Sequence, residues 1–156
     1  DWFDNTIFVF VADHSLTVYR ENYEDLRNGH IPLVLYAPTI LKNPRTIDYP
    51  VSQADIMPTL LGIIDYPLEY FSMGRNVLSN DNGFAMLTSN DHLSWFEDGY
   101  LYSEILGQQA SLLKIDDFLT MSSTEIPVED SRFNFYKNRF RSYLQTAFVQ
   151  FKSFGK

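Results

Sequence analysis

Residues 5–15, NTIFVFVADHS, decide the fold that the sequence predicts. The apolar run at residues 6–11 has no polar alternation, which is typical of strands buried on both faces in the parallel sheets of α/β proteins. The run ends at Ala12, and Asp13 and His14 follow at once. Ligands of open α/β sheets bind just beyond the carboxyl ends of the strands. The sequence therefore places Asp13 and His14 where a functional site is expected.

A second apolar run, HIPLVLYA at residues 30–37, predicts another inner strand. The polar segment 15–29 lies between the two runs, and parallel strands need a crossover of about a dozen residues or more. We therefore expect the two strands to pair in parallel. Buried parallel strands also need neighbours on both sides, and the first strand starts almost at residue 1. We expect the chain to be the C-terminal part of a longer protein.

Residues 51–67, VSQADIMPTLLGIIDYP, predict a helix. Ser52 and Asp55 form a capping-box pattern before an apolar set with helical spacing. Pro58 predicts a kink or a short first turn. Residues 66–81 predict a loop.

The C-terminal half predicts an antiparallel meander followed by a helix. Turn residues separate short strand-like runs at 84–87, 92–96, 100–106 and 111–115. From residue 131 the apolar residues recur every 3.6 positions. The stripe contains Phe133, Tyr136, Phe140, Tyr143, Leu144, Ala147, Phe148 and Phe151, and the basic residues that face elsewhere are Lys137, Arg139, Arg141 and Lys152. We expect the helix to pack on the sheet, and a helix lying on a membrane surface is the alternative.

The composition excludes several classes of function. The chain has 12 basic and 20 acidic residues and a net charge of −8, which disfavours a nucleic-acid partner. It has no cysteine, and so no disulfide, thiolate ligand or cysteine nucleophile. No stretch approaches the ~18 apolar residues of a membrane span. We expect the chain itself to be soluble.

Asp13 and His14 are the leading candidates for a functional site. A carboxylate oxygen beside an imidazole nitrogen suits Zn²⁺ or Mn²⁺, with Mg²⁺ and Ca²⁺ as alternatives. The structural alternative is a turn or helix cap with a partly exposed histidine. His30, at the start of the second strand, is either a boundary residue or a ligand. His92 lies among turn residues, where a solvated or structural role is expected.

The sequence contains no convincing nucleophile. Ser15 and Thr17 follow the Asp-His pair, but hydroxyl groups near such a pair are common. Motifs such as GxSxG, HExxH and a glycine-rich phosphate loop are absent from the sequence. If the protein is an enzyme, we expect its nucleophile elsewhere.

Four blocks in order carry a resemblance to a known family. They are TIFVFVADHS at 6–15, HIPLVLYAP at 30–38, VSQADIMPTLLGIIDY at 51–66 and MGRNVL at 73–78. Over about residues 3–106 the chain resembles the C-terminal part of the sulfatase-like branch of the alkaline phosphatase superfamily, and most of all the lipoteichoic acid synthase group of phosphoglycerol transferases. The resemblance implies that Asp13 and His14 are metal ligands, that 52–61 is a structural helix near the site, and that His30 contacts metal or substrate.

The resemblance also implies an organisation. It predicts a single α/β domain, 1–156, that is the C-terminal portion of an alkaline-phosphatase-like sheet with flanking helices. Its parts are an α/β core at 1–80, a small antiparallel meander at 81–130 and a terminal amphipathic helix at 131–156. The nucleophile precedes the Asp-His pair in relatives, so we expect it in the missing N-terminal part and expect the fragment alone to be inactive.

The function implied is a metal-dependent transferase or hydrolase of phosphate or sulfate esters, most like a phosphoglycerol transferase. We expect its substrate to be a small or lipid-linked ester, its location to be the cell envelope or periplasm, and its membrane association to arise only through the N-terminal part. The alternative is a non-catalytic binding or structural domain that has lost the metal. Its support is Ser15, which stands where relatives have glycine, and the short loop to the next strand.

Overall fold

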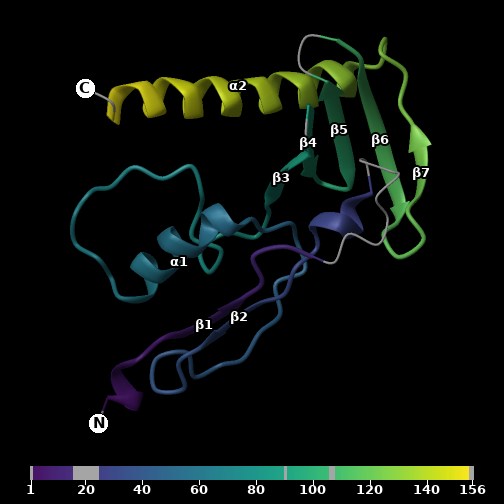
Figure 1. Ribbon diagram of the computed structural model, residues 1–156. Coiled ribbons are helices and arrows are strands. Elements are labelled where there is room, and N and C mark those ends of the chain that lie inside the picture. Colours follow the sequence, from purple (N-terminus) through teal and green to yellow (C-terminus); the bar gives the residue numbers. More distant parts are fainter. Residues whose placement is uncertain (1, 16–24, 90, 106–107, 155–156) are drawn as a thin grey trace. The chain divides into compact units, whose positions relative to one another are not determined.

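The computed structural model describes residues 2–15, 25–89, 91–105 and 108–154 (Figure 1). The chain divides into two compact units, Asp1–Asp48 and Tyr49–Lys156. Among the described residues, the first unit has a two-stranded sheet, and the second has a five-stranded sheet with two α-helices. The predicted α/β class is confirmed, including the antiparallel meander and the terminal helix, whereas the single-domain organisation stays a prediction.

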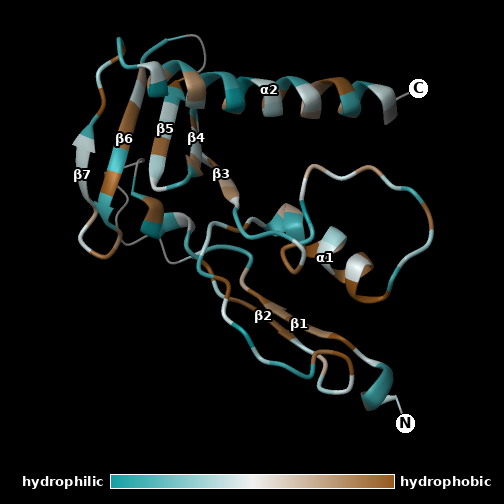
Figure 2. Cartoon of the chain, turned by 180° about the vertical axis from the view of Figure 1, so that it is seen from behind, coloured by the Kyte–Doolittle hydropathy of each residue, from teal (hydrophilic) through white to brown (hydrophobic). Residues whose placement is uncertain are grey.

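The first unit contains two short 3₁₀ turns and two strands. These elements are η1 (Phe3–Asn5), β1 (Phe8–Val11), η2 (Leu26–Gly29) and β2 (Leu33–Tyr36). Both strands are mainly brown in the hydropathy view (Figure 2). The rings of Phe8 and Tyr36, which are cross-strand partners, lie 6.2 Å apart. Such cross-strand aromatic pairs stabilise a sheet.

The predicted parallel pairing of these two strands is wrong. β1 and β2 pair antiparallel, from Phe8 opposite Tyr36 to Val11 opposite Leu33. The expected burial on both faces is also wrong, because Phe10 is 58% exposed. A uniformly apolar run favours a parallel sheet but does not fix the strand direction, and an antiparallel pair needs only a reversal of the chain, with no crossover.

The second unit begins with the predicted helix. The 3₁₀ turn η3 (Gln53–Asp55) leads into α1 (Ile56–Ile63), and the predicted capping box of Ser52 and Asp55 is present. Asp55 accepts a 2.9 Å hydrogen bond from the backbone N–H of Ser52. Pro58 lies in the first turn of α1, where its missing N–H has no intrahelical partner to lose. The helix therefore forms with the short first turn that the sequence predicts.

The sheet of the second unit is the predicted antiparallel meander, in the order β3-β4-β5-β6-β7. Its strands are β3 (Phe84–Ser89), β4 (His92–Glu97), β5 (Tyr100–Ile105), β6 (Ala110–Asp117) and β7 (Ser122–Glu125). The predicted strand end at Leu106 lies outside the described residues. β7 was not predicted, because its sequence SSTE is polar and all four residues are exposed. It therefore lacks the apolar alternation that reveals a strand.

Helix α2 (Ser131–Phe154) crosses one face of this sheet (Figure 1). Its first half packs as predicted, with Phe133, Tyr136 and Phe140 buried beside Trp95 and Tyr102. The end of the helix does not, because Phe148 and Phe151 are 60% and 80% exposed. A helix of 24 residues is about 36 Å long, whereas five strands span about 19 Å between the outer two. The apolar stripe therefore extends past the sheet.

Two arginines of α2 form ion pairs with buried glutamates of the sheet. Arg139 binds Glu97 through two hydrogen bonds of 2.6 and 2.5 Å, and Arg141 binds Glu104 at 3.2 Å. Both glutamates are buried. A buried carboxylate needs a compensating charge. These ion pairs therefore help to position the helix on the sheet, in addition to its apolar stripe.

Candidate metal site

Strand β1 delivers Asp13 and His14 to the surface. The strand ends at Val11, and both residues lie in a bend directly after it. The side chains of Asp13 and His14 are 89% and 79% exposed. The expected position beyond the end of a strand is confirmed, although the strand belongs to an antiparallel pair.

The two side chains converge within this bend. Oδ1 of Asp13 accepts a 2.9 Å hydrogen bond from the backbone N–H of His14. The other carboxylate oxygen, Oδ2, lies 3.7 Å from Nε2 of the His14 ring. Nδ1 of the ring lies 2.9 Å from the carbonyl oxygen of Ser15. A carbonyl can only accept a hydrogen bond, so Nδ1 is the donor in this contact and the Nε2 edge of the ring faces the carboxylate.

This donor set fits part of a metal site. A ring N–H held by a backbone carbonyl is the usual arrangement behind a ligating histidine. Two ligands bound to one tetrahedral Zn²⁺ at about 2.0–2.1 Å are about 3.3 Å apart, close to the 3.7 Å between Oδ2 of Asp13 and Nε2 of His14. Within the parts of the chain that the structure describes, no group of three or more His, Cys, Asp or Glu side chains gathers. Asp13 and His14 can therefore supply two of the ligands that a metal needs.

A hydrogen bond joins Ser15, at the end of this bend, to the η2 turn. The Ser15 hydroxyl donates a hydrogen bond to the carbonyl of Asn28. Asp25 caps η2 by accepting from the backbone N–H of Arg27 at 3.0 Å and also binds its guanidinium. The hydrogen bond from that guanidinium lowers the pKa of Asp25 against the opposing effect of burial. Sequence reasoning missed this anchor, for which the only signal was an Asp two residues before an Arg at a turn.

The other candidates have different positions. His30 is exposed at the end of η2, and it does not join Asp13 and His14 in a cluster of three described acidic or histidine side chains. Its ligand role stays a prediction. His92 begins β4 in the second unit, opposite Ile105. Thr17 lies outside the described residues.

The capping residue Asp55 is the centre of a second polar cluster, in the second unit. It is 1% exposed and accepts a 2.6 Å hydrogen bond from the backbone N–H of Arg75. The Arg75 guanidinium lies 3.3 Å from the Asp55 carboxylate and 3.9 Å from the centre of the Phe84 ring. This cluster ties the start of α1 to β3, which fits the structural role that the sequence predicted for residues 52–61.

Comparisons with known proteins agree with this architecture. The sulfatase family model matches residues 3–66, the segment that contains Asp13, His14 and the capping-box helix. The fold is similar to the crystal structure of a protein in the alkaline phosphatase superfamily from Vibrio parahaemolyticus, with a TM-score of 0.75 and 22% identity. That similarity covers 94% of this chain and 37% of the other. No curated protein sequence matches the chain significantly.

These findings show the fold of the chain and the family that its first part resembles. The chain has the fold of a segment of an alkaline phosphatase superfamily protein and spans 37% of the length of the structure it matches. The sulfatase family match over residues 3–66 agrees with a relation to this superfamily.

Proposed function

We propose that the chain is part of a metal-dependent transferase or hydrolase of phosphate or sulfate esters, most like a phosphoglycerol transferase. The convergence of Asp13 Oδ2 and His14 Nε2 directly after β1 carries this proposal. Both atoms lie in the segment that matches the sulfatase family. Their separation and the hydrogen bond at Nδ1 support a role as two ligands of one divalent ion, Zn²⁺ or Mn²⁺ first, with Mg²⁺ and Ca²⁺ as alternatives.

Each residue of the bend has a separate part in this proposal. Asp13 contributes an anionic oxygen, and His14 contributes a neutral nitrogen. The carbonyl of Ser15 orients the ring of His14, and its hydroxyl ties the loop to Asn28. A bound divalent ion would lower the pKa of a hydroxyl nucleophile and neutralise charge on an ester oxygen. We expect His30 to contact the substrate or the ion.

The proposal extends to the substrate and the location. The substrate is a small or lipid-linked phosphate or sulfate ester, and the nucleophile comes from residues that precede this chain in the protein. The protein acts in the cell envelope or periplasm and meets the membrane through its N-terminal part. Among the described residues, no helix has the length and apolar character of a membrane span.

A non-catalytic domain that keeps the fold without the metal is the second candidate. Its specific support is that no third acidic or histidine side chain joins Asp13 and His14 in the described part of the chain. This protein would use the same bend for binding or for structure alone.

Calorimetric titration of Zn²⁺ and Mn²⁺ into the full-length protein separates the two candidates. The variants Asp13→Ala and His14→Ala are expected to weaken binding at least about 100-fold, because each removes a direct ligand. Asp48→Ala is the matched control, since it removes another exposed carboxylate of the same unit. His30→Ala tests whether His30 binds the ion or only the substrate.

Activity is then measured with chromogenic phosphodiester and sulfate-ester substrates. The enzyme proposal expects turnover that is lost in both ligand variants and retained in Asp48→Ala. A protein that binds no ion would be the non-catalytic domain. Equal ion binding without Asp13 and His14 would reject these two residues as the ligands. Tight ion binding without turnover of either ester would reject the enzymatic part alone.

A further inference from the structure

The backbone pairing of β1 and β2 stops just before the bend that contains Asp13 and His14. The last cross-strand pair is Val11 opposite Leu33. Pro32 precedes Leu33 and has no backbone N–H with which to extend the ladder. The strand pair therefore brings the bend to one of its ends but does not itself hold the bend in place.

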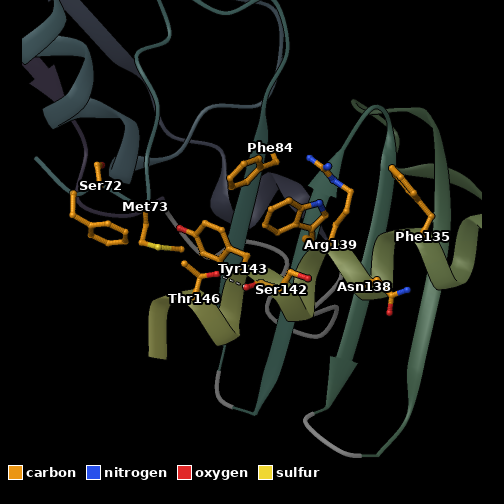
Figure 3. Close-up of a pocket in the computed structure, with 11 residues that line it drawn as sticks. Ser72, Met73, Phe84, Phe135, Asn138, Arg139, Ser142, Tyr143 and Thr146 are labelled. Carbon is orange, nitrogen blue, oxygen red and sulfur yellow. Dashed lines mark hydrogen bonds between the residues drawn. The ribbon is translucent and has the colours of Figure 1, made fainter. Parts of the chain in front are cut away.

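A side-chain hydrogen bond of Ser15 holds the bend at this end. The hydroxyl of Ser15 donates to the backbone carbonyl of Asn28, 13 residues away along the chain. Hydroxyl groups in helices bond locally, to a carbonyl about four residues earlier, as Thr146 does with Ser142 at 2.8 Å in the wall of an open groove along α2 (Figure 3). The bond from Ser15 differs in kind, because it joins the segment after β1 to the turn before β2.

The turn that accepts this bond is itself well fixed. Asp25 is 4% exposed and accepts hydrogen bonds from the backbone N–H of Arg27 at 3.0 Å and from its Nε at 2.8 Å. The backbone N–H of Asn28 donates to the carbonyl of Asp25 at 3.0 Å. These bonds hold η2 in one conformation, so the carbonyl of Asn28 is a fixed acceptor for the Ser15 hydroxyl.

The other polar group of Ser15 faces His14. Its backbone carbonyl lies 2.9 Å from Nδ1 of the imidazole. The hydroxyl and the carbonyl belong to one residue, so a bond that fixes the side chain of Ser15 also limits the directions in which its carbonyl can point. A backbone carbonyl at the second ring nitrogen orients a ligating histidine. The hydrogen bonds therefore form a chain from η2 through Ser15 to His14.

This geometry favours a positioning role for Ser15 over a nucleophilic one. A serine nucleophile passes its proton to a neighbouring base. The hydroxyl of Ser15 donates instead to a backbone carbonyl, which is not such a base. The Nδ1 atom of His14 is engaged with the carbonyl of Ser15 and not with its hydroxyl.

We propose that Ser15 is a positioning residue, whose hydroxyl, bonded to Asn28, holds the carbonyl that orients His14 toward a divalent ion. The proposal rests on the metal site proposed for Asp13 and His14 and adds a side chain that contacts no ion itself. Loss of one neutral hydrogen bond changes an equilibrium by about three- to tenfold.

The first test is calorimetric titration of Zn²⁺ into the full-length protein. Ser15→Ala is expected to weaken binding about three- to tenfold, and Ser15→Thr, which retains a hydroxyl, is expected to keep the wild-type affinity. Thr39→Ala is the matched control. The Thr39 hydroxyl donates to the carbonyl of Asp4 at 2.6 Å, and this bond lies at the opposite end of the same strand pair.

The second test needs no metal. Nitrogen NMR of the His14 ring in the full-length protein, assigned by the loss of its signals in His14→Ala, measures which ring nitrogen carries the proton at alkaline pH, where imidazole is neutral. Ser15→Ala is expected to raise the fraction protonated at Nε2, whereas Thr39→Ala leaves it unchanged. Each alanine removes one bond from a hydroxyl to a carbonyl, so a merely structural role would lower the melting temperature similarly in both variants and leave the ring signals alone.

The proposal is overturned if Ser15→Ala retains the wild-type ion affinity or the wild-type ring signals, if Thr39→Ala changes them equally, or if Ser15→Thr behaves like Ser15→Ala. If the wild type binds no ion, the proposed function fails, and the ring signals alone decide on Ser15. A change of these signals in Ser15→Ala then supports its positioning of the ring, and their constancy overturns it.

Discussion

The ion pair between Arg139 and Glu97 gives the sharpest stability prediction. The Glu97 side chain is 11% exposed and accepts hydrogen bonds from Trp95 Nε1 at 3.0 Å and from two nitrogens of Arg139. Arg139→Met keeps much of the apolar length of the side chain and removes the positive charge. The Glu97 carboxylate would then stay buried, with the Trp95 Nε1–H as its donor among the hydrogen bonds named above.

The size of the effect follows from burial. Removing one partner of a buried ion pair costs about 3–5 kcal/mol. The side chain of Arg139 is 44% exposed, so water can partly replace its guanidinium beside Glu97. We therefore expect Arg139→Met to lower the free energy of unfolding by about 2–3 kcal/mol. This value is consistent with the loss of one hydrogen bond to a charged group, which contributes about 1.5–3 kcal/mol.

Urea unfolding followed by circular dichroism at 222 nm measures this cost. Lys137→Met is the matched control, because it removes one positive charge from the same helix and is expected to change stability by less than about 0.5 kcal/mol. In the double variant Glu97→Gln with Arg139→Met, the cost should fall at least about 1 kcal/mol below the sum of the single costs, since the residues interact directly. Equal effects of Arg139→Met and Lys137→Met, or additive effects of the two substitutions, would refute the reasoning.

Three further predictions test the packing and the titration of the second unit. A Cβ on Gly74 would lie 1.9 Å from a backbone carbonyl oxygen, whereas at Gly99 the φ of +77° costs an alanine about 1–2 kcal/mol. In a urea titration, Gly74→Ala should therefore lower the free energy of unfolding more than Gly99→Ala. The reverse order would contradict the packing before β3. Phe140→Ala should lower the free energy of unfolding by about 3–5 kcal/mol, because Phe140 is fully buried. Phe151 is 80% exposed, so Phe151→Ala should change the melting temperature little. Equal destabilisation by the two substitutions would mean that the end of α2 is covered. Burial raises the pKa of Tyr136 from 10.0 to about 12, and nearby acidic charges contribute less. The unfolded state therefore loses the Tyr136 proton first, and the free energy of unfolding falls as the pH rises from 10 to 12. Tyr136→Phe should make this decline less steep, and an unchanged slope would argue against the burial of Tyr136.

The sequence predicted the second unit well because its patterns are specific. Turn residues such as Asp98-Gly99 separate runs with strand character, and the structure has positive φ angles at both positions, as a tight hairpin turn requires. The capping box of Ser52 and Asp55 marked the start of a helix. These signals act within a few residues, so the sequence alone contains them.

The misses depend on information that is not local. Both faces of the β1 and β2 runs are apolar, and such runs fit either strand direction. The period of α2 predicts which face is apolar, but Phe148 and Phe151 show that it does not predict where the supporting sheet ends. β7 is held by pairing with β6, which leaves no trace in its polar sequence.

The sequence could predict where the residues of the candidate site lie, whereas their role as ligands stays a prediction. The adjacency of Asp13 and His14 at a strand end is visible in the sequence. The hydrogen bond from the ring of His14 to the carbonyl of Ser15 depends on the backbone bend, and so does the tie from Ser15 to Asn28. Sequence reasoning could name the donors but not their orientation.

A crystal structure of the full-length protein grown with Zn²⁺, with anomalous data collected at the zinc absorption edge, tests the metal proposal most directly. We expect one strong anomalous peak about 2.0–2.2 Å from an Asp13 carboxylate oxygen and from Nε2 of His14, with Nδ1 of His14 still hydrogen-bonded to the carbonyl of Ser15. A map without a peak at this bend, or with a zinc ion held entirely by other residues, would contradict it.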